Sequence, residues 1–130
     1  MKNVKRIILD TNFLIDLFRF KLDFDEIEDV AGAPCVFLMI RQSVDELKRT
    51  KTKYAKVGLS FIDSGKIKIV SAPGRTADDA IMSLLKIAKR KKEIKSIAVA
   101  TNDAKLRKKI KTLGVKIIYL RARKHLEMIN

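Results

Sequence analysis

The stretch RIILDTNFLID, residues 6–16, joins a short apolar run to a polar turn and then to a segment of helical period. The apolar residues before Asp10 predict a buried strand that ends at this carboxylate and leads directly into a helix. Strand–helix succession is the building unit of parallel sheets, in which ligands bind just beyond the carboxyl ends of the strands. Asp10 is therefore either a helix cap or a functional carboxylate.

The same alternation continues along the whole chain and predicts an α/β protein. Strands are expected at 5–9, 35–40, 66–70, 96–101 and 115–120, and helices at 12–20, 24–31, 42–49, 54–63, 76–92 and 103–114. Connections of this length indicate a three-layer sandwich around a central parallel sheet. Because no linker or repeat interrupts the pattern, we expect one domain over 1–130, with a basic C-terminal tail at 121–130.

The positive charge is concentrated in the last third of the chain. The net charge is +14, with 29 Lys and Arg against 15 Asp and Glu, and residues 86–130 hold 15 of the basic side chains but only Glu93, Asp103 and Glu127. This excess predicts a polyanionic partner, first of all nucleic acid, although a Lys-rich surface that serves solubility is the alternative. With no Trp and few other aromatic residues, contacts to phosphates are favoured over an aromatic stacking platform.

Several functional classes are disfavoured by the sequence. The longest apolar run, CVFLMI at 35–40, is far too short to span a membrane, and no signal peptide is recognisable. A lone Cys35 and a lone His125 have no partner at zinc-ligand spacing, and no glycine-rich nucleotide-binding loop is present. We therefore expect a cytoplasmic protein without a membrane partner.

Four acidic residues follow four different predicted strands. Asp10 closes one strand, and Asp103 closes another together with Thr101 and Asn102. Glu46 lies about one turn into the helix after the second strand, and Asp78 is among the residues that open the helix after the third. Each also has a structural interpretation. Asp10 and Asp103 are good helix caps, Ser43-x-x-Glu46 matches a capping box, and Thr76-x-x-Asp79 fits a cap that leaves Asp78 facing elsewhere.

The coincidence of these acids at one edge of the sheet favours a metal site. Neighbouring carboxylates raise each other's pKa unless a cation joins them. A set of oxygen ligands without His or Cys suits Mg²⁺ or Mn²⁺, and such an ion activates water and stabilises charge on a scissile phosphate.

The motifs ILDTNFLID, SVDEL, TADDAI and VATNDAKLRKKI resemble those of PIN-domain nucleases, in this order and over residues 5–120. The resemblance implies a five-stranded parallel sheet in the order 3-2-1-4-5 and Mg²⁺- or Mn²⁺-dependent endonucleolytic cleavage of single-stranded RNA. It assigns the catalytic, metal-binding role to Asp10, Glu46, Asp78 and Asp103, with supporting hydroxyls from Thr11 and Thr101.

The resemblance also suggests a biological setting. The segments KYAKVG, TADDA and VKIIYLRARKH are similar to the branch that processes ribosomal RNA precursors during small-subunit maturation. A toxin ribonuclease of a toxin–antitoxin pair and a catalytically inactive RNA-binding scaffold stay open. The corresponding partners are RNA, including precursor ribosomal RNA, a second copy in a homodimer, an antitoxin or a ribosome-assembly protein. The roles of Asp16 and Asp79 also stay open.

Overall fold

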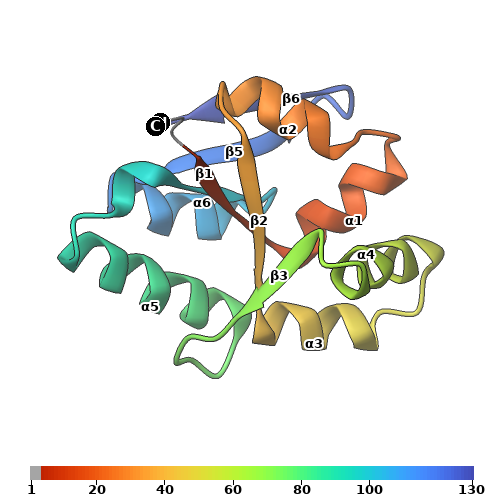
Figure 1. Cartoon of the computed structure of the whole chain (residues 1–130), viewed down its shortest axis with the longest axis horizontal. Coiled ribbons are helices and arrows are strands. Elements are labelled where there is room, and N and C mark those ends of the chain that lie inside the picture. The colour runs from red at the N-terminus through yellow and green to blue at the C-terminus, as the bar shows by residue number, and fades with distance from the viewer. Residues whose placement is uncertain (1–3) are drawn as a thin grey trace.

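A computed structural model describes residues 4–130 (Figure 1). The strands are β1 (Lys5–Leu9), β2 (Cys35–Ile40), β3 (Ile67–Val70), β4 (Ile97–Ala100), β5 (Lys116–Arg121) and β6 (His125–Ile129). The helices are α1 (Thr11–Arg19), α2 (Phe24–Ala31), α3 (Arg41–Arg49), α4 (Lys53–Asp63), α5 (Ala77–Arg90) and α6 (Ala104–Lys111), with a 3₁₀ turn η1 (Ile94–Ser96). None of the helices in this part of the chain combines the length and apolarity needed to cross a membrane.

The sheet has the strand order β3-β2-β1-β4-β5-β6. Its first five strands are parallel in the order 3-2-1-4-5, which confirms the expected fold class and topology. The expected count of five strands is wrong, because β6 pairs antiparallel with β5. Residues 121–130 therefore contain a strand rather than a tail, and its Leu126 is 7% exposed and packs into the core.

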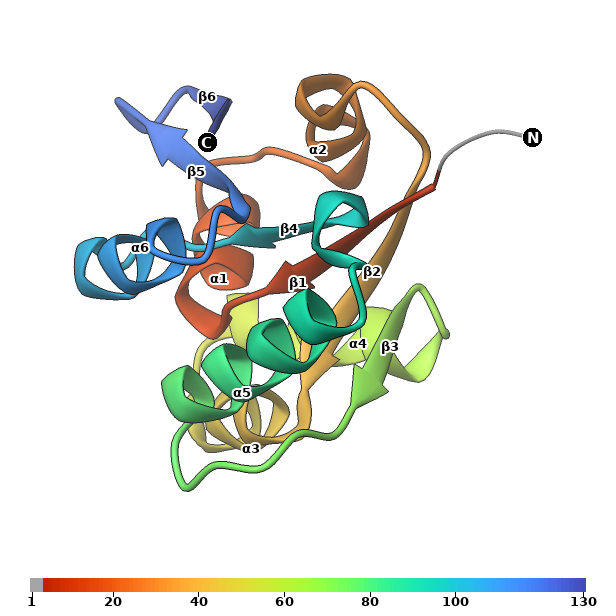
Figure 2. The ribbon, with the colours of Figure 1, turned by 90° about the vertical axis from the view of Figure 1, so that its left-hand side faces the viewer.

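Helices cover both faces of the sheet, as Figure 2 shows. Ile7 and Leu9 of β1 belong to one apolar cluster with residues of α1, α2, α3 and α4. Ile8, between them, belongs to the second cluster with residues of α5 and α6. Because successive side chains of a strand point to opposite faces, a nearly continuous apolar strand is what a sheet covered on both sides requires.

Gly58 allows α4 to lie close to two helices of the site. These are α1, which follows Asp10, and α3, which carries Glu46. A Cβ at this position would lie 3.0 Å from Leu14 Cδ2 and 3.1 Å from Leu47 Cδ2, tighter than ordinary van der Waals contact. The absence of a side chain therefore helps to set the positions of these helices beside the sheet.

The hydrogen-bond ladder between the central strands continues past their ends. The amide of Asp10 donates to the carbonyl of Ala100 at 2.9 Å, and the amide of Thr101 donates to the carbonyl of Ile118 at 3.0 Å. Asp10 and Thr101 are thus held side by side at the carboxyl edge of the sheet, where β1 and β4 are neighbours. The strand order reverses direction at this point, which is where open α/β sheets bind their ligands.

Candidate active site at the carboxyl edge of the sheet

Asp10 is a buried carboxylate at the end of β1, with 6% of its surface exposed. Its Oδ1 accepts a hydrogen bond from the amide of Thr11 at 3.0 Å, and its Oδ2 accepts one from the hydroxyl of Thr101 at 2.8 Å. A capping side chain normally bonds to the second or third amide of a helix, whereas Thr11 is the first residue of α1. Helix capping alone therefore does not account for Asp10.

Burial raises the pKa of Asp10 to about 6. The hydrogen bond from Thr101 acts in the opposite direction, while the negative charges of Asp78 and then Glu46 raise the pKa further. Three of the four predicted acids thus act on one another at this edge. In the metal-free protein Asp10 is a carboxylate that a nearby cation would stabilise.

Two threonine hydroxyls tie the Asp10 turn to its neighbours. The Thr101 oxygen that donates to Asp10 also accepts from the amide of Asp103 at 3.1 Å. The Thr11 hydroxyl donates to the carbonyl of Ser43 at 3.1 Å, at the start of α3. Both threonines are buried, so these bonds fix the turn after β1 against the beginnings of α3 and α6.

Glu46 lies half-buried on α3 and does not belong to a capping box. The helix begins at Arg41, directly after β2, and Ile40 occupies the N-cap position without a side-chain hydrogen bond. Ser43 therefore lies inside the helix, and the capping-box interpretation of Ser43 and Glu46 is wrong. Burial and the charge of Asp78 raise the pKa of Glu46, while Arg49 opposes them.

Asp78 and Asp79 take different directions in the first turn of α5. The Thr76 hydroxyl accepts from the amide of Asp79 at 3.1 Å, so the expected cap at Thr76 is confirmed. Asp79 is exposed, whereas Asp78 is half-buried. Burial raises the pKa of Asp78, the charge of Asp103 raises it further, and Lys109 of α6 lowers it.

Asp103 caps α6, as the structural interpretation of its sequence position predicted. Its Oδ1 accepts from the amides of Lys105 at 2.9 Å and Leu106 at 3.3 Å. Its charge nevertheless reaches Asp78, as the pKa of that residue shows. Asp103 therefore serves the helix and also contributes negative charge to the acidic edge.

The four predicted acids lie at one edge of the sheet but do not form a preformed metal-coordination site. Within residues 4–130, no three Asp, Glu, His or Cys side chains come together closely enough to hold an ion as they stand. The charges are coupled from Asp10 and Glu46 to Asp78, and from Asp78 to Asp103. Mg²⁺ keeps several waters and often binds through one or two carboxylates, so an open set of oxygen donors fits it.

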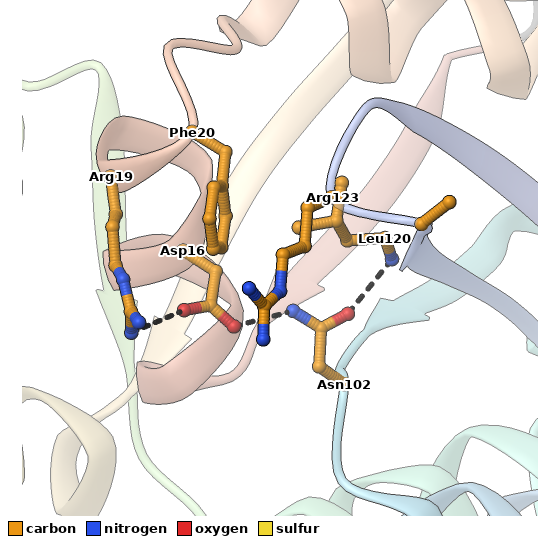
Figure 3. A pocket seen from close by; sticks show the side chains of 7 residues that line it. Asp16, Arg19, Phe20, Asn102, Leu120 and Arg123 are labelled. Carbon is orange, nitrogen blue, oxygen red and sulfur yellow. Dashed lines mark hydrogen bonds and ion pairs between the residues drawn. The ribbon is translucent and has the colours of Figure 1, made fainter.

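A polar contact beside the acids gives Asp16 a structural partner. The side-chain amide of Asn102 donates to Asp16 Oδ2 at 3.0 Å, and its oxygen accepts from the amide of Leu120 at 2.8 Å (Figure 3). Asn102 thereby joins α1, the β4–α6 connection and β5. These contacts lie at a pocket of about 380 Å³ that the sequence pattern did not reveal. The only sequence signal was the helical spacing of Asp16 and Phe20, four residues apart.

Fold and site together define a three-layer α/β domain with acidic residues from four strand–helix connections at the carboxyl edge of its sheet. The chain belongs to the PIN-like domain family, whose model matches residues 7–123. This finding confirms the family resemblance noted in the sequence.

Two relatives are similar to the chain over nearly its whole length. A protein of Methanocaldococcus jannaschii named Ribonuclease VapC4 is 30% identical over 134 residues, which is 96% of this chain and 97% of that protein. A solved structure described as the PIN domain endonuclease Utp24 has a TM-score of 0.77 and 22% identity, and the match covers 95% of this chain and 90% of that one. At this identity the second likeness establishes the fold alone.

Proposed function

We propose that the protein is a Mg²⁺- or Mn²⁺-dependent endoribonuclease that cleaves single-stranded RNA. The observation that carries this proposal is the buried Asp10, whose pKa is raised to about 6 by burial and by the charges of Asp78 and Glu46. Membership of the PIN-like family and the similarity to a protein named as a ribonuclease support RNA as the substrate.

Each acid has a distinct place in the proposed reaction. Asp10, Asp78 and Asp103 hold the metal, and Glu46 holds it or orients the attacking water. Thr101 and the amide of Thr11 fix the Asp10 carboxylate in place before any ligand binds. A divalent ion bound there supplies charge stabilisation for the scissile phosphate and favours deprotonation of water.

The basic segments offset the repulsion between the acids and an incoming phosphodiester. We assign phosphate contacts to the Lys and Arg side chains of 105–111 and 121–125, and expect a smaller contribution from those of 86–95, which lead to the opposite, amino edge of the sheet. Lys109 supports this assignment because its charge already acts on Asp78 across the site. Such contacts position the RNA without reading its sequence.

A cleavage assay on matched aspartates tests the proposal. Labelled single-stranded RNA is incubated with the protein and Mn²⁺, with and without EDTA, and the products are separated by size. We expect internal cuts that need the metal and a loss of at least 100-fold in rate for Asp10→Asn and Asp78→Asn, as for removal of one charge-stabilising group. Asp79→Asn, one residue along and exposed, is the control and should cleave at nearly the wild-type rate.

The same assay distinguishes the enzyme from an inactive RNA-binding scaffold. Circular dichroism first establishes that each variant is folded. An inactive scaffold predicts no metal-dependent cleavage by the wild type, and that result would overturn the nuclease proposal. If folded Asp10→Asn and Asp78→Asn cut as fast as Asp79→Asn, the catalytic assignment of these two acids is wrong.

For the biological role, we propose processing of ribosomal RNA precursors, on the basis of the three segments at 53–58, 76–80 and 115–125. Cells depleted of the protein should then accumulate uncut small-subunit precursors. The near full-length similarity to Ribonuclease VapC4 favours, as a second candidate, a toxin controlled by an antitoxin. That role predicts growth arrest on overproduction, relieved by a small protein that co-purifies in fixed ratio.

A further inference from the structure

The pocket beside the acidic edge lies between three elements that meet only in the folded chain. It has a volume of about 380 Å³ and is lined by the end of α1, the β4–α6 connection and the β5–β6 turn. Asn102 stands at its wall, between Thr101, which bonds to Asp10, and Asp103. The pocket wall is therefore adjacent in sequence to one proposed metal ligand, Asp103, and to Thr101, the hydrogen-bond partner of another, Asp10.

The pocket combines an aromatic ring with two guanidinium groups, as Figure 3 shows. The Arg19 guanidinium carbon lies 5.1 Å from the centroid of the Phe20 ring, and that of Arg123 lies 5.8 Å from it. Arg19 also pairs with Asp16 at 3.7 Å, whereas Arg123 has no ion pair with any residue of 4–130. Planar cations and an aromatic face are the groups on which unpaired nucleobases stack.

The turn that carries Arg123 has a strained backbone. Ala122 and Arg123 have φ values of +54° and +58°, and the amide of Lys124 donates to the carbonyl of Arg121 at 3.1 Å. A two-residue hairpin turn of this hand normally uses Asn-Gly, because both central residues need positive φ. Strain of this kind is concentrated at functional sites, so the conformation that presents Arg123 is consistent with a role in ligand binding.

We propose that this pocket binds one unpaired base of the RNA, next to the phosphate held at the acidic edge. The base stacks on the Arg123 guanidinium, which itself lies over the Phe20 ring, and Asn102 and Asp16 face the polar edge of the base. This subsite rests on the proposed function for the identity of its ligand. It also revises the expectation from composition that the protein contacts phosphates without stacking, because Phe20 lies in the pocket rather than in the core.

Binding without metal tests the subsite separately from cleavage. Fluorescence anisotropy in EDTA compares a labelled single-stranded RNA with the same RNA made abasic at successive positions, so that the backbone charge is unchanged. Wild type should bind the intact RNA about 5- to 100-fold more tightly than at least one abasic RNA, as expected for one stacked base.

Matched variants then locate the base. Phe20→Leu keeps an apolar side chain but loses the ring, and Arg123→Lys keeps the charge but loses the plane. Both should bring the affinity for intact RNA down toward that for the abasic RNA and leave the abasic affinity nearly unchanged. Lys124→Gln, in the same turn but outside the pocket lining, should lower the affinities for intact and abasic RNA by the same factor.

A variant of the β5–β6 turn separates a role in base binding from a purely structural role of Arg123. Ala122→Asn combined with Arg123→Gly gives the turn its preferred residues, so its melting temperature should rise while its preference for the intact RNA is lost. If the preference for intact RNA survives in this variant and in Phe20→Leu, the subsite is wrong.

The two proposals fail separately. Equal binding of intact and abasic RNA by wild type overturns the base subsite, even if the RNA is cleaved when Mn²⁺ is added. If wild type prefers intact RNA through Phe20 and Arg123 but cuts no RNA with metal, the subsite stands and the nuclease proposal fails.

Discussion

At the scale of a single residue, Asp10 lowers the stability of the fold at neutral pH. Its carboxylate is buried at the end of β1, and the carboxylates that act on it, those of Asp78 and Glu46, have the same sign. The hydrogen bond from Thr101 offsets only part of this cost, because the pKa is still raised to about 6. A fold selected for stability alone would place a neutral side chain here, so the charge indicates a function.

Asp10→Asn should stabilise the metal-free protein in a pH-dependent way. Folded Asp10 holds its proton up to about pH 6, while in the unfolded chain it ionises near its ordinary pKa of 3.8. The wild type therefore loses stability as pH rises through this window, and above it the penalty is about 3 kcal/mol at most. We expect Asp10→Asn to be about 1–3 kcal/mol more stable than wild type at pH 8 in urea melts with EDTA, after allowing for altered hydrogen bonds.

The gain from Asp10→Asn should shrink as pH falls toward 4, where wild-type Asp10 is protonated. Asp63→Asn, an exposed carboxylate at the end of α4, is the control and should change the free energy of unfolding by less than about 0.5 kcal/mol at either pH. A destabilised Asp10→Asn at pH 8 would mean that Asp10 mainly stabilises the fold.

Part of the site could be predicted residue by residue, and part could not. Asp10 was recognisable because it follows an apolar run directly, and Asp103 because it belongs to the polar cluster that ends another such run. The hydroxyl of Thr101, shared between Asp10 and the amide of Asp103, depends on β1 and β4 being neighbours, which no local pattern encodes. The bond between Asn102 and Asp16 likewise joins residues that are 86 positions apart in the sequence.

At the scale of elements, α3 and α5 begin in different ways although their sequences look alike. Both have a hydroxyl residue three positions before an acid. Thr76 caps α5 through the amide of Asp79, whereas Ser43 lies inside α3 with its buried hydroxyl unpaired in the part of the chain that the structure covers. The reason is that α3 follows β2 without an intervening loop, so the helix begins at Arg41 and Ser43 is already its third residue.

This difference predicts opposite effects of two alanine substitutions. Thr76→Ala removes a cap and should lower the free energy of unfolding by about 1 kcal/mol. Ser43→Ala removes a buried hydroxyl that has no hydrogen-bond partner within residues 4–130, so the free energy of unfolding should be unchanged or slightly raised. Urea melts at one pH measure the free energies of unfolding of both variants and of the wild type. A loss of about 1 kcal/mol or more in Ser43→Ala would restore the capping-box interpretation.

The element pattern was predictable where hydrophobic periodicity is strong. Strands β1 and β2 have the bounds that the sequence predicted, because their apolar runs end at Asp10 and Arg41. Helix α2 also has its predicted bounds, because Asp23 caps its start and Gly32 ends it. Strand β6 was missed because the basic residues 121–125 resemble a solvated tail and the turn lacks the Asn-Gly signal of a tight hairpin. Its pairing with β5 and the burial of Leu126 outweigh both local signals.

At the scale of the whole molecule, the basic segment 86–130 reaches both edges of the sheet. Lys105 and Lys109 lie on α6, which begins beside the acids. Lys91 and Lys95 lie at the end of α5 and in η1, just before β4 enters the sheet at its opposite, amino edge. All four are exposed and carry the same charge, so their comparison separates position from net charge.

RNA binding should depend on the first pair more than on the second. We expect Lys105→Gln with Lys109→Gln to weaken the binding of single-stranded RNA about 10-fold or more near physiological salt. The salt dependence should also become less steep, by about 0.7 in slope for each phosphate that the protein no longer neutralises. Lys91→Gln with Lys95→Gln is matched in charge and should have a much smaller effect. Anisotropy titrations over a range of salt concentrations measure both, and equal effects of the two pairs would mean that the RNA is bound through net charge alone.

The proposed chemistry depends on one premise, that carboxylates brought to one edge of the sheet by four strand–helix connections share a divalent cation. Anomalous scattering from crystals soaked in Mn²⁺ is its sharpest test. We predict a manganese peak at this edge, in contact with an Asp10 oxygen in the wild type and absent or strongly weakened in Asp10→Asn. An edge without manganese at concentrations that support RNA cleavage, or a peak that Asp10→Asn leaves unchanged, would contradict the premise.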